Sequence, residues 1–122
     1  MNSFEQLDAW QQAHQLVLMI YKVTAQFPTA ERFGITSQLR RATCSVTSNI
    51  AEGFGRYHFK DKQRFYYHAR GSLREIQSII LIARDLHYLS ESSALSIEEL
   101  IIRTNQLING LIRSITEVSM MT

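Results

Sequence analysis

The chain has 122 residues, of which 45% are apolar, 10% aromatic and 20% charged. This composition suits one domain over residues 1–122 with one hydrophobic core, and it argues against disorder. Five glycines and a single proline are few for an all-β chain, which needs many turns. The longest apolar run, Leu16–Tyr21, is too short to cross a bilayer, so no membrane contact is expected. With one cysteine, Cys44, and no visible signal peptide, we expect a cytoplasmic protein.

The first predicted helix runs from about Phe4 to Phe27, and Ser3 with Gln6 forms a capping box at its start. Pro28 ends it, because the residue before a proline is pushed out of the α region. Apolar and small residues recur every three or four positions and predict one buried face: Leu7, Trp10, Ala13, Val17, Ile20, Thr24 and Phe27.

The second predicted helix runs from about Ser37 to Glu52. Gly53 and Gly55 follow it and suit a left-handed exit from a helix. Its apolar stripe is Leu39, Ala42, Val46 and Ile50.

The third predicted helix runs from about Lys62 to Leu89, after Asp61 as its cap. Its core face is predicted to hold Phe65, Ala69, Ser72, Ile76, Ile79, Ile80, Ala83 and His87. The fourth runs from about Ile97 to Val118, with Ser96 and Glu99 as a capping box. Its stripe is Ile97, Leu100, Ile101, Thr104, Leu107, Ile108, Leu111, Ile112 and Ile115. Long helices with short connections predict an all-α, antiparallel up-down-up-down four-helix bundle.

Two of these helices carry large apolar residues outside their core stripes. The candidates for an outward-facing interface are Leu16, Met19 and Val23 on the first helix and Leu81, Ile82, Tyr88 and Leu89 on the third. A helix that is apolar on more than one side is buried on more than one side, so we predict a homo-oligomer. A broad core stripe with scattered exposed aliphatic residues is the alternative.

The net charge is +2, but the charges are unevenly distributed along the chain. Residues 40–74 hold eight Lys/Arg and two Asp/Glu, a local charge of +6, whereas the remaining five Lys/Arg and nine Asp/Glu give −4. Basic residues interleaved with aromatic ones suit phosphate contact and base stacking, so RNA or single-stranded DNA is a possible partner. The candidates are Arg40, Arg41, Arg56, Lys60, Arg64, Tyr67, Arg70 and Arg74. A solvated surface, or ion pairs with a neighbouring subunit, is the alternative.

The sequence carries no signature of a catalytic, cofactor or metal site. Glu-x-x-His and His-Glu-x-x-His are absent, and a lone cysteine cannot build a thiolate zinc site. Five polar residues are interpreted as a structural network that fixes helix register or a subunit contact: Asn49, Glu52, His68, Ser72 and Glu75. A small-molecule enzyme that uses Glu52, His68 and Glu75 is the least favoured reading.

Three strings together resemble the signature of a small bacterial family, the four helix bundle proteins, also called 23S rRNA-intervening-sequence proteins. They are Gln38-Leu39-Arg40-Arg41-Ala42, Asn49-Ile50-Ala51-Glu52-Gly53 and Ala69-Arg70-Gly71-Ser72-Leu73. The resemblance implies a left-handed bundle that assembles into homopentameric rings and has no established catalytic activity. The accessory variability protein of diversity-generating retroelements looks like a structural relative, and it binds nucleic acid and a reverse transcriptase.

Residues and resemblance together predict a non-enzymatic, ring-forming scaffold that binds nucleic acid through a basic face. An accessory protein that binds a protein partner, such as a reverse transcriptase, is the alternative. Because a shared fold does not carry function, the analogy alone does not decide between them.

Overall fold

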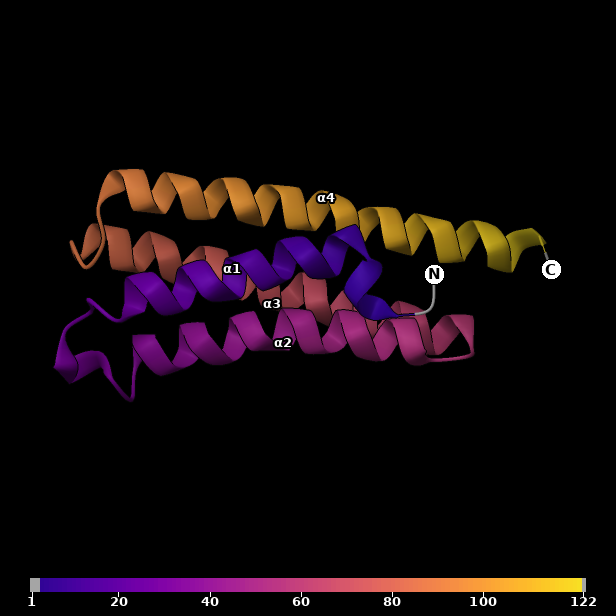
Figure 1. The fold of residues 1–122 in the computed structure, drawn as a ribbon, viewed down its shortest axis with the longest axis horizontal. Helices are drawn as coiled ribbons and strands as arrows, with labels where there is room; N and C mark the ends of the chain where they lie inside the picture. The colour runs from indigo at the N-terminus through magenta and orange to yellow at the C-terminus, as the bar shows by residue number, and fades with distance from the viewer. Residues whose placement is uncertain (1–2, 122) are drawn as a thin grey trace.

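The computed structural model describes residues 3–121, and these residues form four long α-helices and no strand (Figure 1). The helices are α1 (Asp8–Thr24), α2 (Ile35–Gly55), α3 (Phe59–Asp85) and α4 (Glu91–Met121). Two short 3-10 helices, η1 (Phe4–Gln6) and η2 (Thr29–Glu31), precede α1 and α2. The predicted all-α four-helix bundle is therefore confirmed.

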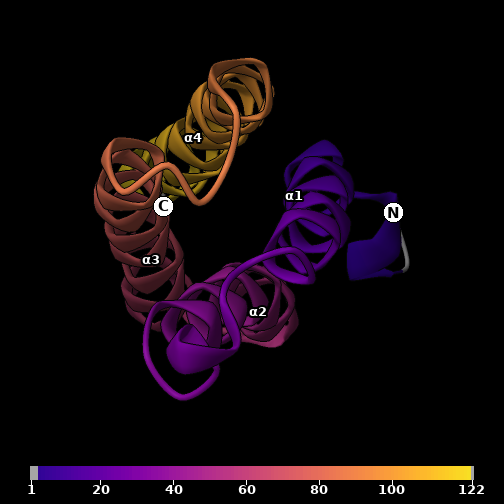
Figure 2. The ribbon, with the colours of Figure 1, turned by 90° about the vertical axis from the view of Figure 1, so that its left-hand side faces the viewer.

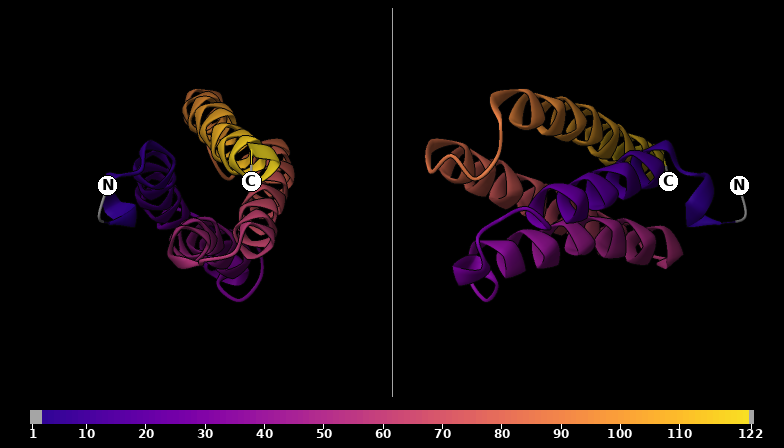
Figure 3. Two further views of the ribbon diagram at one scale, coloured as in Figure 1. Left: turned by 90° about the vertical axis from the view of Figure 1, so that its right-hand side faces the viewer. Right: turned by 60° about the vertical axis from the view of Figure 1, so that its left-hand side comes forward.

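Each helix runs opposite to the one before it, as the colours of Figure 1 show. Both α1 and α3 contact α2 and α4, so the helices occupy the four corners seen in Figure 2. Toward the end at which α1 finishes and α4 begins, these two helices diverge (Figures 2 and 3). The left hand of the bundle stays a prediction.

The core face of α1 differs from the predicted stripe at two places, the first being Ala9, which is buried where half-buried Trp10 is predicted. Leu16 is fully buried with Ala13 and Ile20, whereas Val17 is only half-buried. Ser3 caps η1, its Oγ accepting a hydrogen bond from the Glu5 N–H at 3.3 Å, so the predicted capping box at the start of the long helix is wrong. The assignment of Leu16 to an outward-facing interface is also wrong, since its side chain lies in the core.

The end of α2 is closed by packing and by a lysine. Gly53 is buried, and a Cβ added there would lie 2.6 Å from Cε1 of Tyr66. No glycine between residues 3 and 121 has a positive φ, so the predicted left-handed exit is wrong. The Lys62 Nζ donates hydrogen bonds to the carbonyls of Gly53 and Phe54 at 3.2 and 2.8 Å, satisfying backbone acceptors that the helix end leaves open.

In α3 the buried face is turned slightly from the predicted one. Tyr66 and Leu73 are buried, while their predicted neighbours Phe65 and Ser72 are half-buried. The helix stops at Asp85, and His87, predicted to lie in the core, is exposed with φ 63°. The Tyr88 N–H bonds to the Ala83 carbonyl at 2.9 Å and the His87 N–H to the Arg84 carbonyl at 3.0 Å. This pattern is a Schellman motif, which ends the helix without a glycine.

The helix α4 begins six residues earlier than predicted. Ser90 Oγ accepts a hydrogen bond from the Ser93 N–H at 3.1 Å and caps it. Ser96 and Glu99 are exposed within the helix, so the predicted capping box there is wrong. With 31 residues, α4 is about 46 Å long at 1.5 Å per residue. It extends past the α2–α3 turn in Figure 1.

Candidate nucleic-acid interface

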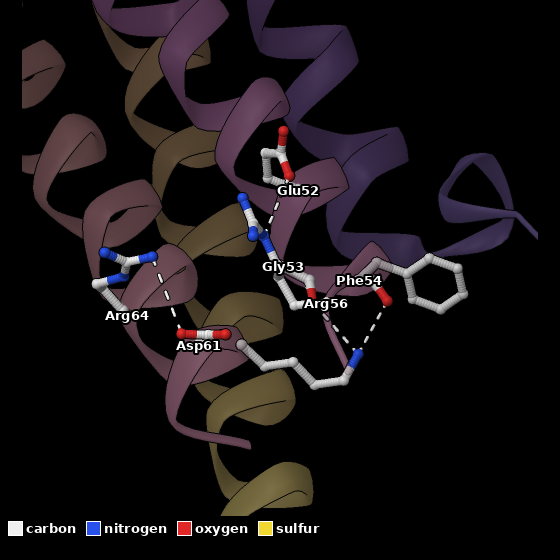
Figure 4. Close-up of polar contacts among 7 residues, drawn as sticks. Glu52, Gly53, Phe54, Arg56, Asp61 and Arg64 are labelled. Atoms are coloured by element: carbon white, nitrogen blue, oxygen red, sulfur yellow. Dashed lines mark hydrogen bonds and ion pairs between the residues drawn. The ribbon is translucent and has the colours of Figure 1, made fainter. Parts of the chain in front are cut away.

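The turn between α2 and α3 gathers charged side chains (Figure 4). Arg56 Nε lies 3.4 Å from Glu52 Oε2, and Arg64 Nη2 lies 3.9 Å from Asp61 Oδ1. All four side chains are largely exposed, so each ion pair contributes at most about 0.5 kcal/mol to the free energy of unfolding. Each guanidinium is therefore free to bind an anion. Burial lowers the pKa of Lys62, whose ammonium is committed to backbone carbonyls.

Phe65 holds two of these guanidinium groups in place. The Cζ atoms of Arg56 and Arg64 lie 4.8 and 4.9 Å from the centre of its ring. Such cation–π contacts contribute about 0.5–1 kcal/mol at exposed sites. The two positive groups are therefore oriented before any ligand arrives.

Five residues line the outward side of α3, which we call the α3 ridge: Lys60, Arg64, Tyr67, Arg70 and Arg74. From residue 60 to residue 74 the ridge is about 21 Å long. Tyr67 is 42% exposed, and the Cζ of Arg70 lies 4.8 Å from its ring centre. Asp61 is the acidic residue within this stretch of α3, and Glu75 follows directly after it. The ridge thus combines four positive charges with an accessible ring.

The members of the ridge are not equally free. Arg70 Nη1 donates a hydrogen bond to Asn109 Oδ1 at 2.9 Å and so ties α3 to α4. Lys60 and Arg74 are exposed and make no hydrogen bond or ion pair within residues 3–121. These two residues are the best probes of ligand binding, because their removal disturbs nothing else.

Arg40 and Arg41 do not join the ridge. Arg40 stacks on Tyr21 of α1, with its Cζ 4.6 Å from the ring centre, and its Nε donates to Thr24 Oγ1 at 3.0 Å. Arg41 is exposed near the start of α2, whereas Arg70 and Arg74 border α4. The prediction of one basic face over residues 40–74 is therefore wrong for these two arginines.

The predicted polar network forms only in part. Ser45 Oγ lies 2.9 Å from Ser72 Oγ across α2 and α3, and the Asn49 amide donates to the Ser45 carbonyl and Oγ at 2.8 and 3.0 Å. Three of its predicted members lie outside it and are exposed: Glu52, His68 and Glu75. The prediction that these three residues belong to the network is therefore wrong, and His68 forms no hydrogen bond or ion pair with Glu52 or Glu75.

The remaining interface candidates fall into two groups. Leu81 and Ile82 are exposed, at 43% and 49%, and Leu86, which the sequence reasoning missed, is 49% exposed beside them. Four others are half-buried and pack on the core: Met19, Val23, Tyr88 and Leu89. The centres of the Tyr88 and Phe27 rings lie 5.6 Å apart, and the Tyr88 hydroxyl donates a hydrogen bond to Glu31 Oε2 at 2.9 Å. Tyr88 therefore has partners inside its own subunit.

Other kinds of site find little support in the described part of the chain. Between residues 3 and 121, no three His, Cys, Asp or Glu side chains come together as a metal site. No helix in that range is both long and apolar enough to cross a bilayer.

The fold and the α3 ridge define an all-α four-helix bundle with a basic face that carries aromatic rings. The chain belongs to the 23S rRNA-intervening sequence protein family, whose sequence profile matches residues 5–110. It also resembles the crystal structure of a protein of unknown function from the S23 ribosomal protein family of Bacteroides thetaiotaomicron. The TM-score is 0.79 at 16% identity, over 86% of this chain and 95% of that one, which shows a shared fold. No curated protein matches the chain.

Proposed function

We propose that this chain is a non-enzymatic, cytoplasmic, ring-forming protein that binds RNA or single-stranded DNA through the α3 ridge. The observation that carries the proposal is the combination of exposed Lys60 and Arg74 with the half-exposed ring of Tyr67 on one helix side. Basic groups contact phosphates, and an exposed ring stacks on a base without reading sequence. Binding is therefore expected to tolerate sequence changes and to weaken with salt.

The salt dependence can be stated in advance. If the four basic groups of the ridge each meet one phosphate, log K falls with log salt with a slope of about −3 on a single strand. The test is fluorescence anisotropy of a labelled 20-nucleotide RNA titrated with protein at several salt concentrations. The double variant Lys60→Ala/Arg74→Ala should lower the slope to about half and weaken binding to every sequence alike.

The matched control is Arg113→Ala, which removes an exposed positive charge from α4. It should leave the affinity close to that of the unaltered protein. Absence of RNA and single-stranded DNA binding at low salt would overturn the proposal, as would equal losses in the control and the double variant. Arg70→Ala is a poor first choice, because it also breaks the bond to Asn109.

Self-association is supported by two distinct apolar surfaces. The first, the α3 end patch, consists of Leu81, Ile82 and Leu86. The second is formed near the end of α1 by Met19 and Val23, which pack on the core but are only half-buried. A closed ring needs two different complementary surfaces on each subunit, since each copy contacts its two neighbours in different ways. The homopentamer implied by the family resemblance is one such ring.

Analytical ultracentrifugation at micromolar concentration tests this arrangement. Leu81→Glu/Ile82→Glu should give a monomer, and so should Met19→Glu/Val23→Glu if circular dichroism shows that it folds. When mixed, the two variants should form a dimer, because each retains the surface that the other has lost. Leu18→Glu, at another exposed leucine, is the control and should leave the assembly intact. A stable monomer of the unaltered chain would refute the ring.

A further inference from the structure

A pocket of about 370 Å³ opens where the end of α1 meets the start of α2. Its volume falls in the lower part of the range of pockets that hold small ligands. Six of the residues that line it carry aromatic, basic or thiol side chains: Tyr21, Arg32, Phe33, Arg40, Arg41 and Cys44. It lies beside α1 and α2, whereas the α3 ridge borders α4, so it is a separate site.

The charge of this pocket is strongly positive. Three guanidinium groups line it, and no carboxylate among residues 3–121 does. Arg41 makes no side-chain hydrogen bond or ion pair within that range, and neither does the Arg32 guanidinium, whose Cζ lies 5.2 Å from the centre of the Phe33 ring. The acidic neighbour in sequence, Glu31, is engaged elsewhere by the Tyr88 hydroxyl and the Ile35 N–H. The pocket therefore holds positive charge that no carboxylate within residues 3–121 neutralises.

The arginines are also arranged to bind an oxyanion. Arg40 spends its Nε on Thr24 Oγ1 and lies flat on Tyr21, so its terminal nitrogens make no bond within residues 3–121. Fixing a guanidinium in this way lowers the entropy that it loses on binding. Paired terminal N–H groups match the geometry of phosphate oxygens.

The aromatic residues add a second kind of recognition. Phe33 is 86% exposed, which gives it no part in the core, and Tyr21 is 42% exposed. A large ring exposed beside unpaired guanidinium groups suits a ligand that joins a flat base to an anionic group. Neither feature alone would select such a ligand.

We propose that this pocket binds a nucleoside monophosphate, either free or as the phosphorylated end of a nucleic-acid strand. A phosphate monoester carries between one and a half and two negative charges at neutral pH, and here it meets three arginines. The base stacks on Phe33 while the phosphate is held by Arg32, Arg40 and Arg41. The pocket binds this ligand whether or not the α3 ridge binds a strand.

Cys44, the single cysteine of the chain, reports occupancy because it lines the same pocket. The experiment measures by mass spectrometry the rate at which N-ethylmaleimide alkylates Cys44 with and without adenosine 5′-monophosphate. At a ligand concentration of ten times Kd the rate should fall about tenfold, since about one pocket in eleven stays free. Adenosine alone and inorganic phosphate alone should protect far less. No protection at about 10 mM nucleotide, or equal protection by inorganic phosphate, overturns the proposal.

Substitutions at two exposed pocket residues, with one control substitution elsewhere, test the roles of the charge and the ring. Arg41→Ala should weaken protection about tenfold or more, as expected for loss of a charge-assisted hydrogen bond. Phe33→Ala should reduce the affinity for the nucleotide to that for ribose 5-phosphate. Arg103→Ala, at an exposed arginine of α4, should change nothing, and an equal loss there would also overturn the proposal.

The source of the ligand is decided by comparing oligonucleotides that differ only in a 5′-phosphate. Stronger protection by the phosphorylated strand than by the mononucleotide supports a strand end, and the reverse order supports a free nucleotide. Lys60→Ala/Arg74→Ala should leave protection by the mononucleotide unchanged. A result that contradicts strand binding by the α3 ridge can therefore be distinguished from one that contradicts nucleotide binding by the pocket.

Discussion

Two glycines inside helices should respond to the same substitution with opposite signs. Gly53→Ala places a methyl group 2.6 and 2.9 Å from two ring carbons of Tyr66 and 3.2 Å from Cβ of Phe65. Gly71→Ala places it in open space, with no atom of the subunit within 4 Å. Both positions have helical backbone, so the gain in helix propensity is common to both.

The expected magnitudes follow from these distances. Replacing an internal helical glycine with alanine stabilises a helix by about 0.5–1 kcal/mol. At Gly71 this gain is unopposed. At Gly53 the buried Tyr66 ring must move, and overpacking of that kind costs about 1–3 kcal/mol. The free energy of unfolding should therefore rise by about 0.5–1 kcal/mol for Gly71→Ala and fall by up to about 2.5 kcal/mol for Gly53→Ala.

Urea unfolding followed by circular dichroism measures both values. Protein concentration must be held constant, because assembly adds to apparent stability. Gly55→Ala serves as a second open control, since a Cβ at Gly55 meets nothing within 4 Å. A stabilised Gly53→Ala together with a destabilised Gly71→Ala would refute the packing argument. Reduced assembly of a stable Gly71→Ala subunit would instead place Gly71 at a subunit contact.

Two further effects concern buried hydroxyl groups. Thr43 Oγ1 is buried without a hydrogen-bond partner in the described residues. Thr43→Val should therefore raise the free energy of unfolding by about 1–2 kcal/mol in the same urea assay. A free energy equal to or below that of the unaltered protein would contradict this. Burial raises the pKa of Tyr66 from 10.0 to about 12, so its contribution to stability is complete below pH 10 and is lost as pH rises toward 12. The loss is about 2 kcal/mol at pH 12, and Tyr66→Phe should remove that part of the pH dependence, which a pH series of urea unfolding curves checks.

Periodicity predicted the helices because each must bury one side, but it could not choose between adjacent apolar residues. Leu16 and Val17 both fit a core position of α1. Packing against the other helices buries Leu16. The first residues also form a separate 3-10 helix, so counting from Leu7 and Trp10 shifted the expected stripe. The spacing of apolar residues could not show which side of α1 is buried, because the 3-10 helix interrupts the α-helical period.

The ends of helices depended on contacts that are distant in sequence. The serine-rich stretch before Ile97 could be capped at several places, and Ser90 is the one that the structure uses. Gly53 is conformationally ordinary but is required by the ring of Tyr66 from the next helix. The distribution of charge along the chain indicates the basic nucleic-acid candidates, but it cannot show that Arg40 and Arg41 lie on another side of the bundle from Arg74.

The hydrogen bond between Tyr88 and Glu31 joins residues 57 positions apart and so has a consequence for folding order. The pair α2–α3 is linked by only three residues, so its chain closure costs little entropy and can come first. The bond to Glu31 requires α3 to have ended and the α1–α2 connection to be in place, so it forms late. That end of the bundle is then the first to open in native fluctuations, and backbone amides at the start of α2 exchange with solvent before those in its centre.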